Sequence, residues 1–463
     1  MSNSPHDLYV FLHGERVGRL VLLRRGAVHL YYDFDASKSS VPLSLSLRPG
    51  RQGRSDVSSW IDGLLPENPR IRSRWARELG ARSAAPFDLL CTEAGLESSG
   101  AIQFCSQPVL PDPESGTLTK LTDAELGAKL RLVSQDAESD PAEGLSYLRL
   151  SLPGAQPKIA LRRTSDGWHL PSGSLATTHI LKPQKGHLNP AVRDSIAVNE
   201  HLCQVAASEL DLNAAHTSLE VIDGETALVV ERFDRELIDG SVRRLHFEDL
   251  CQAMGLPTAI KYQEDGGPGP ETVIEFLRGE SGRASVSEFF SAMFYNWLIG
   301  NPDGHIKNYG LLLDGSHPKL APLFDVSSLS PYAGTGNRAM PTAMRFAGAP
   351  PSTLDDWAQI ANRLKTGVTA FTLRDIADGL PDAFAYAASQ CPSWATETAS
   401  AVCESIVAHA GQKIQGAEDT FDIGPRPDAS RPTHDKRCGR RVRRTGKPCL
   451  LRSDHRGNCR SVL

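Results

Sequence analysis

The sequence predicts an α+β protein with two lobes, a β-rich lobe followed by a larger helical one. Its 463 residues exceed one ordinary domain. Short runs rich in β-branched and aromatic residues dominate up to about residue 233, and apolar residues at helical spacing dominate beyond it. The contents of 40% hydrophobic and 23% charged residues exclude a disordered, collagen-like or membrane-embedded class.

Residues 1–108 are predicted to form an extra N-terminal β/α module. Glycines join three short strand-like runs in the pattern of a meander, at residues 8–12, 20–23 and 28–32. Between residues 57 and 80, Pro66 is expected to divide two helices. Pro, Ser and Gly around residues 108–113 indicate a boundary, after which we expect a linker over residues 109–140.

The two lobes are expected over residues 141–232 and 233–416. In the first lobe one helix is predicted over residues 195–210, and strands are predicted at 148–152, 159–163, 179–182, 220–222 and 227–231. In the second lobe helices are predicted at 247–254, 272–278, 286–299, 354–364, 372–380 and 399–413. Ligands commonly bind at such a junction between lobes.

The polar loop at residues 300–310 holds the densest chemical signal. An apolar helix ends at Gly300, and Asp303 and Asn308 follow five positions apart. In phosphoryl-transfer enzymes this spacing places an Asp that accepts the substrate proton and an Asn that binds magnesium. Asp325, after an apolar run, suits a second magnesium ligand. Each motif alone also fits a solvated loop or a helix cap.

An upstream lysine completes the pattern. Lys182 ends a predicted strand, from which its ammonium would reach nucleotide phosphates, although an exposed strand-end lysine is the alternative. The turn before that strand, residues 151–158, contains a single glycine and matches neither the kinase glycine-rich loop nor the GxxxxGK[ST] loop. The order of lysine strand, helix, hinge, polar loop and second Asp is nevertheless that of a protein-kinase-like fold.

Several segments together resemble the HipA family, the serine/threonine-kinase toxins of bacterial toxin–antitoxin pairs. The resemblance runs in order from about residue 8 to about residue 410. The segments that carry it are 63–68 (GLLPEN), 154–158 (GAQPK), 178–182 (THILK), 231–235 (ERFDR), 248–257 (EDLCQAMGLP), 261–262 (KY), 265–269 (DGGPG), 300–308 and 325–327 (DVS).

The resemblance implies roles for individual residues. Asp303 would be the catalytic base, Asn308 and Asp325 the Mg²⁺ ligands, and Ser151 the site of an autophosphorylation that switches the kinase off. Residues 231–233 resemble the adenine-binding hinge. The implied nucleotide-binding residues are Lys182, Lys158, Glu231, Arg232, Phe233, Gly154, Ala155 and Gln156. His305 and Lys307 in the polar loop either orient the loop or have a purely structural role.

The resemblance also implies the reaction and the partners. The γ-phosphate of ATP would pass to Ser or Thr hydroxyls of a target protein, for which aminoacyl-tRNA synthetases are the best-known class in the family. A HipB-like helix-turn-helix antitoxin would neutralise the toxin and link it indirectly to DNA. The alternatives are a small-molecule or lipid kinase of related fold, and a non-catalytic corepressor that binds a DNA-binding antitoxin.

The C-terminal tail, residues 417–463, differs from the rest in charge. The formal net charge of −5 divides into +9 over residues 424–463 and −14 over the remainder. Cys438, Cys449, His455 and Cys459 could hold Zn²⁺, although a disordered basic extension is equally compatible with the spacing. Weak nucleic-acid binding or an acidic protein partner would suit the arginines.

The expected location is the cytoplasm, without membrane contact. The start of the chain lacks the basic-then-apolar pattern of a secretory signal, and no run of about 18 apolar residues occurs. Six further cysteines lie singly along the chain, which favours reduced thiols over disulfides.

Overall fold

The computed structural model describes residues 7–24, 26–33, 41–48, 54–112, 116–135, 156–184, 190–315, 317–332, 343–348 and 350–418. The chain divides into two units, Met1–Ala417 and Glu418–Leu463, and the architecture below is that of the first unit. Within the described ranges, no helix combines the length and the apolar character that crossing a membrane requires.

The N-terminal module is built on a four-stranded antiparallel sheet in the order β3-β2-β1-β4. Its elements are β1 (Asp7–Leu12), β2 (Glu15–Leu22), β3 (Val28–Tyr32), α1 (Arg54–Gly63), α2 (Pro69–Glu78), α3 (Pro86–Leu90) and β4 (Ile102–Cys105). The predicted meander and the two helices on either side of Pro66 are confirmed. Asn68 begins α2 by accepting a hydrogen bond from the Arg70 amide, and the rings of Trp60 and Phe104 meet in the core.

The first lobe contains a six-stranded antiparallel sheet in the order β5-β7-β6-β8-β10-β9. Its elements are β5 (Leu118–Lys120), α4 (Asp123–Gln135), β6 (Ile159–Thr164), β7 (Gly167–Pro171), β8 (His179–Pro183), α5 (Pro190–Glu209), β9 (Thr217–Ile222) and β10 (Glu225–Glu231). The predicted strands at 159–163, 179–182, 220–222 and 227–231 and the predicted helix are present. The strand predicted at 148–152 lies outside the described residues.

The linker predicted at residues 109–140 needs correction, because β5 and α4 belong to this lobe. β5 pairs with β7, and α4 packs on β8, β9 and β10 with Leu126 and Leu130 buried. A three-residue strand whose side chains are all exposed shows no alternation of apolar and polar residues. Its pairing partner lies about 50 residues further along the chain, beyond the reach of local sequence patterns.

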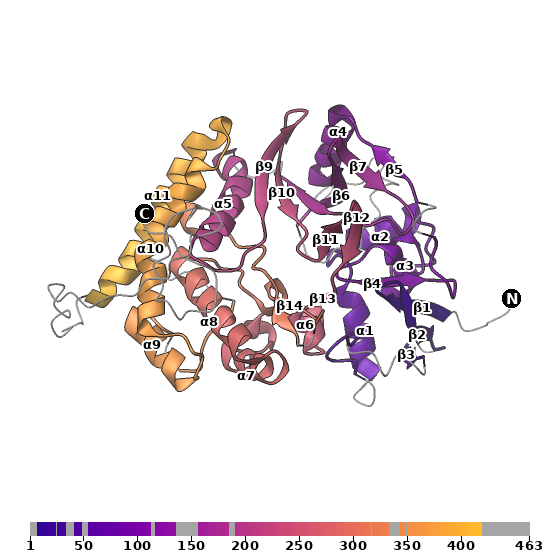
Figure 1. Cartoon of the computed structure of the whole chain (residues 1–463), viewed down its shortest axis with the longest axis horizontal. Coiled ribbons are helices and arrows are strands. Elements are labelled where there is room, and N and C mark those ends of the chain that lie inside the picture. The colour runs from indigo at the N-terminus through magenta and orange to yellow at the C-terminus, as the bar shows by residue number, and fades with distance from the viewer. Residues whose placement is uncertain are drawn as a thin grey trace. The chain divides into compact units, whose positions relative to one another are not determined.

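The second lobe is mainly helical. Its elements are β11 (Arg235–Ile238), β12 (Ser241–Arg244), β13 (Phe247–Asp249), α6 (Leu250–Ala253), α7 (Pro270–Glu280), α8 (Gly282–Ile299), β14 (Gly310–Leu312), β15 (Lys319–Leu320), α9 (Leu354–Arg363), α10 (Ala370–Ser389) and α11 (Thr396–Glu418). Figure 1 shows α10 alongside α5 and α9, with α8 packed in the same group. The residues of α8 are buried on nearly every side, so α8 holds the polar loop that follows it in place.

The helix predicted at residues 247–254 is wrong in its first three residues. Residues 247–249 form β13, which pairs with β14 next to the polar loop. Asp249 then caps α6, since its side chain accepts a hydrogen bond from the Gln252 amide while Gln252 bonds back to the Asp249 amide. This capping box starts the helix at Leu250 and leaves the preceding residues free to pair as a strand.

Candidate active site

Lys182 lies at the centre of a buried ion network. From β8 its Nζ donates a hydrogen bond of 2.6 Å to Oε1 of Glu200 on α5, and both side chains are at least nine-tenths buried. The same Nζ also contacts Oδ1 of Asp325, whose side chain is a third exposed. Burial would lower the pKa of Lys182, but the charges of Asp325 and Glu200 outweigh this and raise it. Lys182 is therefore held as a cation beside two carboxylates.

Asp325 combines this contact with an unusual backbone. Its φ is +54°, in the left-handed region that aspartate tolerates better than most residues and that recurs at functional sites. Burial would by itself raise the pKa of the carboxyl, yet the positive charges of Lys182 and Lys158 lower it. Asp325 thus stays a carboxylate at neutral pH.

Lys158 adds a second positive charge to the network. It precedes β6, and its electrostatic neighbours include Asp325 and Lys182. Burial lowers the pKa of Lys158 to about 8, with Asp325 opposing the shift and Lys182 adding to it. Gln156 lies two residues earlier in a bend and is half-buried.

The polar loop after α8 is fixed by side-chain amides. Gly300 ends α8 with a φ of +69°, where a Cβ would lie 2.8 Å from the His409 ring, so glycine is required. Oδ1 of Asn301 accepts a 2.9 Å hydrogen bond from the Asp303 amide, and Nδ2 of Asn308 donates one of 2.8 Å to the Asp303 carbonyl. These bonds hold the backbone of Asp303 while about half of its side chain stays exposed.

Asp303 lies next to Tyr262, for which the sequence predicts no role in the site, and to His305, for which it predicts two alternative roles. The hydroxyl of Tyr262 donates a 2.5 Å hydrogen bond to Oδ1 of Asp303. Nε2 of His305 lies 3.7 Å from the same oxygen, and the His305 and Tyr262 rings meet edge to face with centroids 4.8 Å apart. Burial lowers the pKa of His305. Of its two predicted roles, the geometry favours orientation of the loop.

Lys307 has a structural position. It is buried, and its Nζ donates hydrogen bonds to Oδ2 of Asp249 at 2.7 Å and to the carbonyl of Gly63 at 3.1 Å. Asp249 caps α6 and Gly63 ends α1, so Lys307 ties the polar loop to the second lobe and to the N-terminal module.

The donor chemistry of Asp325 and Asn308 fits Mg²⁺. Mg²⁺ binds through oxygen and is usually held by one or two protein carboxylates together with phosphate oxygens and water. Asp325 supplies a carboxylate and Asn308 an amide oxygen, since its Nδ2 is already used as a donor. Across the part of the chain that the structure describes, no three His, Cys, Asp or Glu side chains gather as a preformed metal site.

The hinge residues 231–233 have different environments. The Glu231 side chain is more than half exposed. The Arg232 guanidinium is buried against the carboxylates of Glu97 and Asp234, at 2.7 and 2.8 Å, so only its backbone is left to contact a nucleotide. The Phe233 ring packs against Phe324, the residue before Asp325, with centroids 5.6 Å apart.

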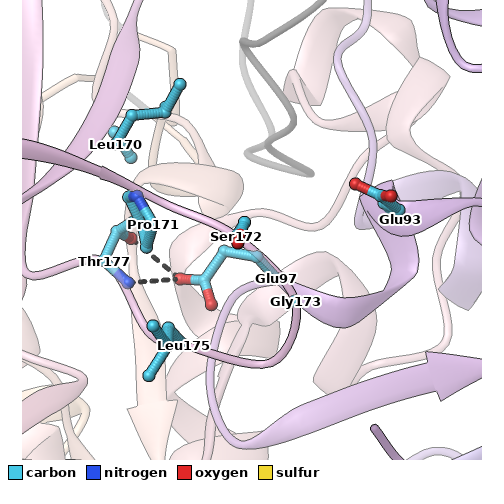
Figure 2. Close-up of a pocket in the computed structure, with 9 residues that line it drawn as sticks. Glu93, Glu97, Leu170, Pro171, Ser172, Gly173, Leu175 and Thr177 are labelled. Carbon is cyan, nitrogen blue, oxygen red and sulfur yellow. Dashed lines mark hydrogen bonds between the residues drawn. The ribbon is translucent and has the colours of Figure 1, made fainter. Parts of the chain in front are cut away.

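A small cavity lies between the N-terminal module and the first lobe, near this hinge and apart from the ion network. Its volume of about 20 Å³ suits one water molecule and excludes a nucleotide. Figure 2 shows the Glu97 carboxylate at its wall, where it accepts hydrogen bonds from the hydroxyl and the amide of Thr177, at 2.8 and 3.3 Å. Glu97 therefore stabilises the contact between the N-terminal module and the first lobe.

Some predicted residues lie outside the described part of the chain. These are Ser151, Gly154 and Ala155 before β6, and Cys438, Cys449, His455 and Cys459 in the tail. Autophosphorylation, the phosphate-covering loop and the zinc site therefore stay predictions.

A β-rich lobe that carries Lys182 and a helical lobe that carries Asp303 and Asp325 define a two-lobed kinase-like fold. Two family models cover most of the chain, the HipA N-terminal domain over residues 8–105 and the HipA-like C-terminal domain over residues 150–391. The chain belongs to the HipA family.

Its relatives include proteins named as kinases. It is 34% identical over 340 residues to "Putative kinase Y4mE" of Sinorhizobium fredii, covering 70% of this chain and 78% of the relative. It is 30% identical over 323 residues to the serine/threonine-protein kinase toxin HipA of Shewanella oneidensis, covering 66% of this chain and 70% of the relative. These relatives support a HipA-like kinase.

A solved structure has the same fold. It is a complex of HipA and HipB from Shewanella oneidensis with operator DNA, and its matching chain has a TM-score of 0.74 and 24% identity. The match covers 90% of this chain and 100% of that one, so the two chains share the fold over nearly their whole lengths.

Proposed function

We propose that the protein is a serine/threonine-protein kinase toxin that transfers the γ-phosphate of ATP to a hydroxyl of a target protein. The observation that carries this proposal is the Lys182–Glu200–Asp325 network. A strand lysine paired with a helix glutamate, together with an aspartate for the metal ion, is the nucleotide-binding arrangement of protein kinases.

Each residue of the site has a task in this reaction. Lys182 and Lys158 attract the phosphates of ATP, while Asp325 and Asn308 hold Mg²⁺, which offsets phosphate charge when bound. Asp303 orients the substrate hydroxyl and takes its proton. The hydroxyl oxygen forms the new bond to the γ-phosphorus, the bond from that phosphorus to the bridging oxygen breaks, and ADP leaves.

Regulation and partners follow from the family. We infer that Ser151 is autophosphorylated as an off-switch and that a HipB-like antitoxin neutralises the toxin and connects it to DNA. An aminoacyl-tRNA synthetase is the target class that the family suggests. A small-molecule or lipid kinase would share the ATP site, and a corepressor would need the antitoxin contact without catalysis.

Incubation with labelled ATP and a cell lysate, followed by identification of labelled proteins and sites, tests the proposal. We expect label on Ser or Thr of a specific protein and on Ser151, and no transfer by Asp303→Ala at unchanged melting temperature. Label confined to a small molecule or lipid would contradict a protein-kinase function. Transfer by Asp303→Ala would contradict the assignment of the base.

A further inference from the structure

Residues 63–68 of the N-terminal module touch the catalytic loop region at two places. The Gly63 carbonyl accepts a hydrogen bond from Lys307 of the polar loop. Oε2 of Glu67 accepts one of 2.7 Å from Nζ of Lys261, the residue before Tyr262. Both partners of this second contact are largely buried, with side chains 20% and 15% exposed. A segment outside the two lobes therefore borders the site where phosphoryl transfer is proposed.

The Glu67–Lys261 ion pair leads directly to Asp303. Nζ of Lys261 lies 5.3 Å from the centroid of the Tyr262 ring, within the range of a cation–π contact. His305 packs against the same ring edge to face. Held between these two groups, Tyr262 directs its hydroxyl at Oδ1 of Asp303, 2.5 Å away.

We propose that Tyr262 is a positioning residue for the Asp303 carboxylate, and that Glu67 of the N-terminal module keeps Tyr262 in place through Lys261. This inference rests on the proposed kinase function. Tyr262 occupies one carboxylate oxygen and fixes the rotation of the group, so the second oxygen is oriented to accept the proton of the substrate hydroxyl. The N-terminal module is then a part of the active site in addition to any role in binding partners.

The charge and exposure of the groups support this assignment. Asp303 is about half exposed, and an exposed carboxylate without a fixed partner would rotate among several orientations. A hydrogen bond to a charged group stabilises one of them, and small errors in the placement of a catalytic group slow reactions strongly. Burial raises the pKa of Tyr262, and the hydrogen bond to Asp303 raises it further, so Tyr262 stays a donor.

Steady-state kinetics of the full-length protein test the inference, with ATP and the labelled target protein as substrates. For Tyr262→Phe we expect kcat to fall about ten- to a hundredfold, the range that loss of one hydrogen bond to a charged group gives, with the KM for ATP unchanged. Glu67→Gln should lower kcat in the same direction but less. Tyr386→Phe, at an exposed tyrosine of α10, is the matched control and should leave both constants unchanged.

A charge exchange distinguishes positioning from a general loss of structure. Glu67→Lys and Lys261→Glu each place like charges together and should lower kcat. The double variant restores the ion pair but not the cation–π contact of Lys261 with Tyr262, so its kcat should exceed that of the worse single variant and stay below that of the wild type. Melting temperatures measured in parallel show whether each variant is folded at the temperature of the assay.

Two results would overturn this inference and leave the proposed kinase function intact. One is a kcat of Tyr262→Phe at or above that of the wild type, and the other is a kcat of the double variant no higher than that of the worse single variant. A wild-type protein that transfers no phosphate would overturn the proposed function and the inference with it. If the wild type transfers phosphate and Asp303→Ala does not, the proposed function stands, and a failed prediction for Tyr262 then counts against the inference only.

Discussion

Nζ of Lys182 and Oε1 of Glu200 lie 2.6 Å apart, and their side chains are only 5% and 7% exposed. The pair joins β8 of the first lobe to α5. A buried lysine and glutamate stabilise each other only as a pair, because either one left alone would be an uncompensated charge away from water. The pair therefore fixes the position of α5 relative to β8.

Replacing Glu200 by Gln should weaken nucleotide binding. The amide removes one negative charge, so Lys182 is drawn towards Asp325 and away from the phosphates. We expect kcat/KM for ATP to fall about tenfold or more, because the substitution removes a charge-assisted hydrogen bond. Glu404→Gln, at an exposed position of α11, is the control. Equal ATP kinetics for both variants would show that Glu200 has no role in the site.

The sequence predicts those parts of the site that have a local pattern. Asp303 and Asn308 share one loop and Lys182 lies in a short strand-like run, so the order and spacing of these elements are enough to propose their roles. Glu200 and Tyr262 have no such pattern. Tyr262 meets Asp303 across 41 positions of sequence, and only the tertiary fold brings them together.

Lys158 predicts a pH dependence of ATP binding. Its pKa is lowered by burial to about 8, so its ammonium is present below pH 8 and is lost as the pH rises through this value. The affinity for ATP should therefore decrease between pH 7 and pH 9 in the wild type. Titration with a fluorescent ATP analogue measures this change.

Two variants separate Lys158 from other titrating groups. Lys158→Met should bind ATP more weakly at pH 7 and vary less up to pH 9. Lys158→Arg keeps its charge over the whole range and should retain affinity at pH 9. A wild-type pH dependence that survives in Lys158→Met would assign it to another group.

The contact between the N-terminal module and the hinge predicts a large effect on stability. Glu97 lies buried among Arg232, Arg235 and Arg244. Burial would raise its pKa, but the three guanidinium groups lower it to about 2. Glu97→Ala leaves buried arginines without this partner and should lower the free energy of unfolding by roughly 3–5 kcal/mol, measured by urea denaturation.

An exposed ion pair gives the control for this measurement. Glu236 pairs with Arg243 on the hairpin β11–β12, with side chains 46% and 60% exposed. Glu236→Ala should cost less than about 1 kcal/mol. Equal losses for the two variants would mean that the Glu97 cluster contributes no more than a surface pair. Because the folded pKa of Glu97 is depressed, its contribution should also disappear as the pH falls from about 4.5 towards 2.

The same cluster explains why the hinge was only partly predicted. Resemblance predicts that residues 231–233 (ERF) bind nucleotide, but it does not distinguish a backbone contact from a side-chain contact. The partner of Arg232, Glu97, comes from a different module 135 positions earlier. Local sequence patterns around a charged hinge residue do not show which distant residue it pairs with.

Glu248 predicts an opposite pH dependence of stability. It lies in β13 with no exposed surface, and its Oε1 accepts a 2.9 Å hydrogen bond from the amide of Leu45 in the N-terminal module. Burial raises the pKa of Glu248 from 4.5 to about 8. The folded state therefore keeps this proton over a pH range in which the unfolded chain has lost it, so the free energy of unfolding decreases from about pH 4.5 to pH 8.

Glu248→Gln removes the titration and retains an oxygen that can accept the hydrogen bond from Leu45. The variant should melt at a higher temperature than the wild type at pH 8, and the difference should shrink as the pH falls towards 5. Glu236→Gln, on the exposed hairpin, should show no such trend. Melting curves that stay parallel for Glu248→Gln and the wild type from pH 5 to pH 8 would mean that Glu248 is ionised in the folded protein, which would require a cationic partner to compensate its buried charge.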